Sequence, residues 1–150
     1  MYTVIMKPKF QRLYNNIAHE VAKMSHARRL QVGAVIVKDD RVISMGYNGM
    51  PAGWENNCEF EWTDPQTKQT SLVTRPEVLH AESNAIAKLA KSNDCGDGAD
   101  IFITHAPCME CAKLIYQSGI RRVYFNQNYR DDAGIRFLKQ SGIEVVKHEE

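Results

Sequence analysis

The sequence predicts an α/β fold built around one mixed sheet of five strands, on two observations. From residue 80 onward, apolar β-branched runs alternate with segments of helical period, which is typical of parallel strands joined by helices. Between residues 31 and 48, two more β-branched runs flank a short polar break, which is typical of an antiparallel hairpin. Because a chain of 150 residues has the usual size of one domain, we expect residues 1–150 to form a single domain.

Residues 9–25 carry apolar side chains three and four positions apart, which predicts an amphipathic helix lying against the core. This stripe consists of Phe10, Leu13, Tyr14, Ile17, Val21 and Met24. The run VGAVIV at 32–37 is apolar enough to be a central strand, with Asp39 and Asp40 as the turn to its partner. Residues 48–79 are polar and show no sustained period, which predicts a long irregular loop, and loops of that length are usually functional or mobile.

The second half of the chain alternates helices and strands, and two glycines mark helix ends. Gly119 and Gly142 each follow a segment of helical period, where a residue in the left-handed conformation commonly closes a helix. The expected elements are a helix over 80–92, a strand ending at residue 104, a helix over 108–120, a strand over 121–126, a helix over 132–142 and a strand over 143–148.

The composition is that of an ordinary globular protein, with 43% hydrophobic residues, 25% charged residues and a formal net charge of +1. A general nucleic-acid-binding protein would be more basic, so no nucleic-acid partner is expected. The N-terminal residues lack a long apolar core, so neither export nor a membrane partner is indicated. We therefore expect a cytoplasmic protein in a reducing compartment, where its four cysteines are not held in disulfides.

Two of these cysteines, in the segment HAPCMEC at 105–111, indicate a metal site. Cys108 and Cys111 are three positions apart in the first turn of a predicted helix, where the positive dipole end favours thiolates. Two thiolates leave a tetrahedral zinc ion short of ligands, and His80, which begins another helix, is the candidate for the third. A Cys₂His set leaves one position for water, which is typical of a catalytic zinc ion. A redox or structural cysteine pair is the alternative interpretation.

Glu82 follows His80 by two residues and completes a pattern with known chemistry. A carboxylate beside zinc-bound water can act as a general base and, once protonated, as a general acid. The pattern H-x-E followed by P-C-x-x-C is the signature of zinc-dependent nucleobase deaminases, and this sequence contains both parts as HAE and PCMEC.

Three longer segments resemble one branch of the cytidine deaminase superfamily, the deoxycytidylate (dCMP) deaminases. They are VGAVIVKDDRVISMGYNGMPAGW, HAESNAI and PCMECAKLIYQSGIRRVYF, and the similarity runs from about Ser25 to Val146. The resemblance implies a three-layer α/β/α fold and zinc-dependent hydrolysis of dCMP to dUMP and ammonia, which supplies dUMP for thymidylate synthesis. It also implies a homo-oligomer, often a hexamer, that dCTP activates and dTTP inhibits.

The resemblance also implies roles for residues around the base and sugar. Asn48 in GYNG is expected to hold the sugar, and the backbone around Thr104 and Ala106 to contact the pyrimidine edge. Tyr129 is the candidate for an aromatic wall of the base pocket. The alternatives are a left-handed turn conformation for Asn48 and ordinary packing for Tyr129.

The phosphate of a nucleoside monophosphate requires local cations, because the near-neutral chain provides no general attraction for an anion. Arg29 is the first candidate, because it stands three residues before VGA, where relatives tend to place a polar or basic phosphate contact. Arg28, Arg121 and Arg130 follow. A solvated surface charge is the alternative for Arg29.

The resemblance also implies that the polar segment NGMPAGWENNCE helps to form a regulatory site for dCTP or dTTP, with Mg²⁺ on the triphosphate. Its candidate residues are Gly46, Tyr47, Gly49, Met50 and Asn57.

The sequence departs from its relatives near a possible second zinc site. Relatives with a structural zinc ion tend to have cysteine five residues before VGA, where this chain has Ala27. His26 and Cys58 could still contribute to such a site, so a second zinc ion stays open. His105 stands where an apolar residue is common, and the sequence offers no reason for it.

Two other functions fit parts of the pattern. One is a deaminase for free cytidine, for deoxycytidine or for adenosine in tRNA. The other is a catalytically inactive zinc-binding module, although such a module would gain nothing from Glu82 beside the metal.

Overall fold

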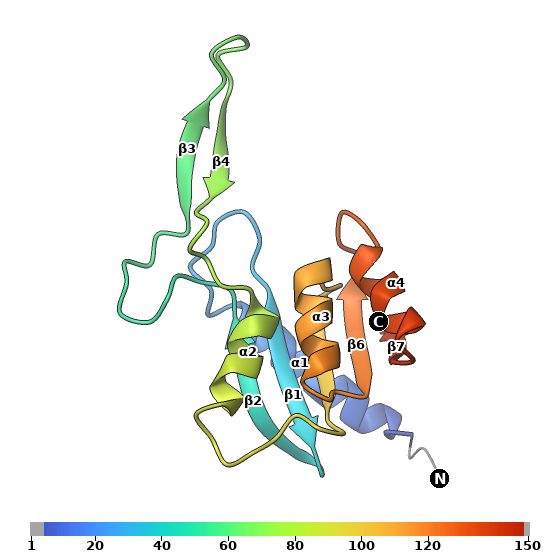
Figure 1. Cartoon of the computed structure of the whole chain (residues 1–150). Helices are drawn as coiled ribbons and strands as arrows, with labels where there is room; N and C mark the ends of the chain where they lie inside the picture. The colour runs from blue at the N-terminus through green and yellow to red at the C-terminus, as the bar shows by residue number, and fades with distance from the viewer. Residues whose placement is uncertain (1–4, 149–150) are drawn as a thin grey trace.

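The computed structural model describes residues 5–148, and Figure 1 shows the whole chain. In chain order the elements are α1 (Pro8–Ala22), β1 (Gly33–Lys38), β2 (Arg41–Tyr47), β3 (Glu59–Thr63), β4 (Thr70–Thr74), α2 (Ala81–Leu89), β5 (Asp100–His105), α3 (Met109–Gln117), β6 (Arg122–Gln127), α4 (Ala133–Gln140) and β7 (Glu144–Lys147).

The central sheet is mixed and has five strands in the order β2-β1-β5-β6-β7, which confirms the predicted sheet. Strands β5, β6 and β7 are parallel, whereas β1 is antiparallel to both β2 and β5. The expected turn between β1 and β2 forms at Asp39 and Asp40, whose φ angles of 52° and 59° are those of a type I′ hairpin turn. Gly119 and Gly142 have φ angles of 85° and 83°, and each lies two residues after the last residue of α3 or α4, as predicted for residues that close helices.

Alternate side chains of the central strands point to opposite faces of the sheet, and helices cover both faces. On one face Ile36 of β1 and Ile103 of β5 pack in a core with α2, α3 and α4. On the other face Val35 and Phe102 pack against α1, where the Phe102 ring stacks on that of Tyr124 at 4.3 Å between centroids. The protein therefore has the three-layer α/β/α arrangement, with α1 behind the sheet in the view of Figure 1.

Helix α1 is shorter than predicted, and its buried face is rotated from the predicted stripe. The helix ends at Ala22, so Met24 lies beyond it and is 62% exposed, and Leu13 is 47% exposed. Small side chains explain the rotation, because Ala18 and Ala22 allow the helix backbone to approach Gly33 of β1 closely. With its 15 residues, α1 is the longest helix within residues 5–148, and none of the helices there has the length and apolar character needed to span a bilayer.

The predicted irregular loop over 48–79 contains a second sheet, which the sequence reasoning missed. Strands β3 and β4 form an antiparallel hairpin that projects from the body of the molecule, at the top of Figure 1. Among the described elements the two strands pack substantially only against each other. The alternation in EFEWT, with exposed Phe60 and Trp62 on one side of the ribbon, was the available signal.

Candidate active site

Three side chains that are far apart in sequence meet at the end of β5 and the beginning of two helices. The Nδ1 atom of His80 lies 3.3 Å from Sγ of Cys111 and 3.6 Å from Sγ of Cys108. All three potential ligand atoms lie within 4.8 Å of one another, and within residues 5–148 no other group of three or more His, Cys, Asp or Glu residues converges in this way. One imidazole and two sulfurs at such separations fit a tetrahedral zinc ion.

Helix N-termini place these ligands, and the start of α3 favours the thiolate form of Cys108. His80 is the N-cap of α2, and Cys108 is the N-cap of α3, with Cys111 one turn further on. A hydrogen bond from the Cys111 thiol, together with one from His80, lowers the pKa of Cys108 to about 3. The same bond to Cys108, with burial, raises the pKa of Cys111. The pair therefore shares one proton tightly and offers a thiolate to a metal ion.

Glu82 is buried beside this cluster, with 4% of its surface exposed. Burial raises the pKa of its carboxyl group to about 7, although hydrogen bonds from its own backbone and from the Cys111 thiol, with the charge of His80, act in the opposite direction. A carboxyl group with a pKa near neutrality can both accept and release a proton at physiological pH.

A cavity of about 210 Å³ opens onto the cluster at the carboxyl end of β5, where parallel sheets commonly bind ligands. Its lining includes four predicted substrate-binding residues together with His80, Glu82 and Cys108. These four are Arg29, Asn48, Ala106 and Tyr129. The fifth, Thr104, does not line the cavity. Its hydroxyl group accepts a hydrogen bond from the Gly33 backbone at 3.2 Å and contacts Nδ1 of His105 at 2.9 Å.

Two of the lining residues already use part of their hydrogen-bonding capacity within the protein. The Asn48 side chain donates to the Leu30 carbonyl at 2.7 Å and accepts from the Val32 N–H at 2.8 Å, so it fixes the segment that enters β1. The Ala106 N–H donates to the Gln127 carbonyl at 2.8 Å. What Ala106 can offer a substrate is therefore its carbonyl oxygen, and Asn48 retains one N–H and one lone pair.

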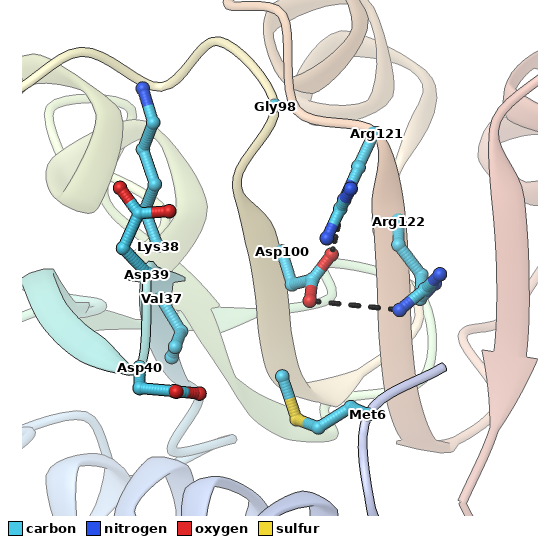
Figure 2. A pocket seen from close by; sticks show the side chains of 9 residues that line it. All are labelled: Met6, Val37, Lys38, Asp39, Asp40, Gly98, Asp100, Arg121 and Arg122. Carbon is cyan, nitrogen blue, oxygen red and sulfur yellow. Dashed lines mark hydrogen bonds and ion pairs between the residues drawn. The ribbon is translucent and has the colours of Figure 1, made fainter. Parts of the chain in front are cut away.

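The structure separates the four arginines proposed for phosphate. Arg29 and Arg130 line the cavity, with the Arg130 guanidinium 5.4 Å from the centre of the Tyr129 ring. Arg28 pairs instead with Glu59. Arg121 lies at the opposite end of β5, in a separate cavity of about 360 Å³, where it bonds to Asp100 at 3.4 Å (Figure 2). This position makes Arg121 unsuitable as a phosphate ligand at the site.

The candidate regulatory residues lie between β2 and the projecting hairpin, and several have clear packing roles. Gly46 is buried under α2, where a Cβ atom would lie 2.5 Å from the Ala81 carbonyl oxygen. The Tyr47 carbonyl accepts a hydrogen bond from Asn84, and Gly49 forms a β-bridge with Leu79. Asn57 accepts a hydrogen bond from the Arg28 guanidinium at 3.2 Å, and Met50 is half-buried. None of these contacts tests a regulatory role, which stays a prediction.

The described residues give little support to a second zinc site. Neither His26 nor Cys58 belongs to a converging group of three potential ligands within 5–148. Burial raises the pKa of the Cys58 thiol, which opposes the thiolate form that zinc requires. His105, for which the sequence gave no role, lines the cavity, and burial together with the charge of His19 lowers its pKa.

Sequence reasoning missed two residues that shape the site. Gly134 of α4 faces the backbone of Pro107 and Cys108 so closely that a Cβ atom would lie 2.8 Å from the Cys108 carbonyl oxygen. Glu59 is a buried acid at the base of the hairpin that bonds to the segment carrying Arg29. A glycine in an ordinary helix and an acid in a polar stretch carry no sequence signal of such contacts.

Comparison with known proteins agrees with this geometry. The family described as the cytidine and deoxycytidylate deaminase zinc-binding region matches residues 8–127. The ComE operon protein 2 of Bacillus subtilis is 38% identical over 136 residues, which are 88% of this chain and 67% of that protein. The deoxycytidylate deaminase of Saccharomyces cerevisiae is 33% identical over 147 residues, which are 94% of this chain and 45% of that protein.

A solved structure extends the agreement to the whole fold. The dCMP deaminase of the cyanophage S-TIM5, crystallised in complex with dCMP and dUMP, is 39% identical to this chain. The two structures match with a TM-score of 0.85 over 96% of this chain and 100% of that chain. The resemblance seen in the sequence motifs is therefore confirmed, and the chain belongs to the cytidine and deoxycytidylate deaminase family.

Proposed function

We propose that the protein is a dCMP deaminase that converts dCMP and water to dUMP and ammonia. One observation carries this proposal: His80, Cys108 and Cys111 converge beside a buried carboxyl group, in a cavity that also exposes arginine side chains. The convergence provides a zinc site with an acid–base group next to it. The arginines provide a place for the phosphate of a nucleotide.

The reaction replaces the exocyclic amine at C4 of cytosine by an oxygen atom from water. His80, Cys108 and Cys111 would hold a zinc ion, which would supply a reactive water molecule, because coordination lowers the pKa of water from 15.7 to about 7. Glu82 accepts one proton from the attacking water and passes it to N3 of the ring. It then accepts the second proton from the new hydroxyl group and delivers it to the amine, which leaves as ammonia from the tetrahedral carbon.

The pKa of Glu82 suits both halves of this sequence. A carboxyl group with a pKa of about 7 is basic enough to take a proton from a nucleophile and acidic enough to return it. Its burial also keeps bulk water from exchanging the proton during the transfer.

Substrate recognition follows from the other residues that line the cavity. We assign the phosphate, which carries nearly two negative charges at neutral pH, to Arg29, with Arg130 on the Tyr129 side of the cavity. Tyr129 offers an aromatic face to the base, and the Ala106 carbonyl oxygen offers an acceptor to it. Asn48 keeps its sugar role in this proposal, and Thr104 supports the site through its bonds to Gly33 and His105.

The family resemblance supports further proposals about the whole enzyme. These are a role in supplying dUMP for thymidylate synthesis, activation by dCTP and inhibition by dTTP with Mg²⁺ on the triphosphate, and assembly into a homo-oligomer, with a hexamer favoured, in the cytoplasm. The polar segment around Gly49 and Asn57 is the proposed regulatory region. Sigmoidal dCMP kinetics that neither nucleotide changes would count against the regulatory proposal.

Ammonia release from dCMP, deoxycytidine and tRNA, measured alongside zinc content, tests the proposed activity. We expect wild type to bind one zinc ion and to favour dCMP. Glu82→Gln is expected to retain zinc, because residue 82 is not a ligand, and to lower kcat by about 10²- to 10⁴-fold, the usual contribution of a general acid–base group. Cys108→Ser is expected to lose both zinc and activity.

A zinc-loaded wild-type protein that releases ammonia from none of these substrates would contradict the proposal and favour an inactive zinc-binding module. Turnover of tRNA or deoxycytidine in preference to dCMP would keep the chemistry and change the substrate.

A further inference from the structure

Glu59, the first residue of β3, is a buried acid that the proposed mechanism does not use. Only 1% of its surface is exposed. One oxygen atom of its carboxylate accepts two hydrogen bonds, from the backbone N–H of Arg28 at 2.9 Å and from that of Arg29 at 3.0 Å. The other oxygen lies 3.5 Å from Nε of Arg28. One side chain therefore holds two successive backbone amides of the segment between α1 and β1.

The base of the hairpin holds the guanidinium group of Arg29 as well. Glu59 pairs across the ribbon with Thr74, the last residue of β4. The Thr74 hydroxyl accepts a hydrogen bond from Nη1 of Arg29 at 3.0 Å. The two residues of this terminal ladder pair thus fix both ends of Arg29, its backbone through Glu59 and its side-chain tip through Thr74.

Arg29 is the point where these contacts reach the cavity. Both Arg29 and Thr74 line the cavity that contains His80 and Glu82. Asn48 fixes the chain just after Arg29 through the Leu30 carbonyl and the Val32 N–H. The segment is therefore held on both sides, and a long, flexible arginine side chain is directed into the site at a reduced cost in conformational entropy.

We propose that Glu59 is a positioning residue that holds Arg29 in place to bind the phosphate of the substrate. This role rests on the proposed dCMP deaminase function and deepens it, because it links specificity for a nucleotide over a nucleoside to the base of the projecting hairpin. The reacting ring atoms lie with His80, Glu82 and the cysteines, so Glu59 affects phosphate binding and leaves the chemical step unchanged.

The main test is Glu59→Gln, which keeps the size of the side chain. An amide presents an NH₂ group where one carboxylate oxygen stood, so the ion pair with Arg28 is lost, and one acceptor is replaced by a donor facing N–H groups. We expect KM for dCMP to rise roughly 10- to 100-fold with kcat within about twofold, as for the loss of a uniform binding interaction. For deoxycytidine, which lacks the phosphate, kcat/KM is expected to stay within about twofold.

Three comparisons separate positioning from a general structural effect. Glu61, two residues further along β3, has an exposed side chain, so Glu61→Gln is the control and is expected to change the kinetics with neither substrate. Thr74→Val removes the hydroxyl acceptor at nearly constant shape and is expected to raise KM for dCMP in the same selective way. In an Arg29→Ala background, Glu59→Gln is expected to add no further increase in KM, because the residue that it positions is gone.

Equal losses on dCMP and deoxycytidine, or additive effects of Glu59→Gln and Arg29→Ala, would overturn the positioning role. If Glu59→Gln does not fold, Thr74→Val tests the inference independently. An unchanged KM for dCMP in Thr74→Val refutes it. A wild type that turns over neither substrate refutes the proposed function, which is a different result from an active wild type whose discrimination Glu59→Gln leaves intact.

Discussion

The space left by the missing side chain of Gly134 is expected to fix the position of Cys108. A Cβ atom at residue 134 would lie 2.8 Å from the carbonyl oxygen of Cys108 and 2.9 Å from its carbonyl carbon, and closer still to the carbonyl oxygen of Pro107. Cβ atoms in proteins essentially never lie within 3.0 Å of a backbone atom, and a backbone atom cannot relieve such a contact by a change of side-chain rotamer. Gly134→Ala must therefore move α4 or the segment that carries Cys108 by several tenths of an ångström.

The size of the effect follows from two opposing contributions to stability. Overpacking costs about 1–3 kcal/mol, whereas replacing glycine by alanine within a helix gains about 0.5–1 kcal/mol. A net loss of about 1–2 kcal/mol corresponds to a fall in Tm of roughly 2–8 °C for a chain of this size. The displacement also exceeds the tolerance of about 0.2 Å in metal–ligand distances. Zinc affinity is therefore expected to fall about 10- to 100-fold, as for changes directly behind metal ligands.

Zinc competition with a chromogenic chelator, alongside thermal unfolding of the zinc-loaded protein, measures both effects. Gly33→Ala is the matched control, because its Cβ atom would meet the backbone of Ala18 and Ala22 in α1, on the face of the sheet away from the zinc ligands. We expect the control to lose stability and to keep its zinc affinity. A Gly134→Ala protein that binds zinc as tightly as wild type would refute the reasoning.

Two further predictions concern charged and titrating groups. Asp100→Asn removes a carboxylate that faces Arg122, whose side chain is only 2% exposed. Because Arg122 keeps its ion pair with Glu144 at 2.9 Å, we expect the free energy of unfolding, measured by chemical denaturation, to fall by only about 1–3 kcal/mol. The kcat/KM of the folded variant is expected to stay within about twofold, since Asp100 is the first residue of β5 and the zinc ligands lie beyond the other end of this strand. A large loss of activity would contradict this placement. Burial lowers the pKa of His105 in the folded protein, so the unfolded chain protonates this side chain more readily than the folded protein does. The stability that neutral His105 contributes above about pH 6.5 is therefore lost as the pH falls. Tm measured from pH 8 to pH 5 is therefore expected to fall further for wild type than for His105→Gln, and parallel curves would show that His105 does not contribute.

The parts of the fold that follow a strong local period could be predicted from sequence. The central strands are apolar on both faces, and Asp39 and Asp40 favour the turn that joins β1 to β2. The hairpin of β3 and β4 was missed because little of its ribbon is buried, so the apolar alternation that reveals most strands is reduced to Phe60 and Trp62. The stripe of α1 was misplaced because alanine can face a closely packed strand while larger apolar residues remain exposed.

The metal-ligand cluster was more predictable from sequence than the proposed substrate contacts. His80, Glu82 and the two cysteines belong to short patterns whose spacing is dictated by metal geometry and by the first turn of a helix. Arg121 was an unsuitable candidate because adjacent arginines give no sign of which end of a strand they occupy. Contacts such as those of Glu59 and Gly134 join residues that are 25 or more positions apart, so they become visible only once the chain is folded.

The ligands of the zinc site come from helices that lie far apart along the chain. His80 and Cys108 are separated by 28 positions, and all of β5 lies between them. An ion held at both places acts as a cross-link that closes this stretch into a ring, which restricts the unfolded chain in the way that a disulfide bond would. Catalysis and the stability of the fold thus depend on the same ion, so a protein that loses its metal is both inactive and easier to unfold.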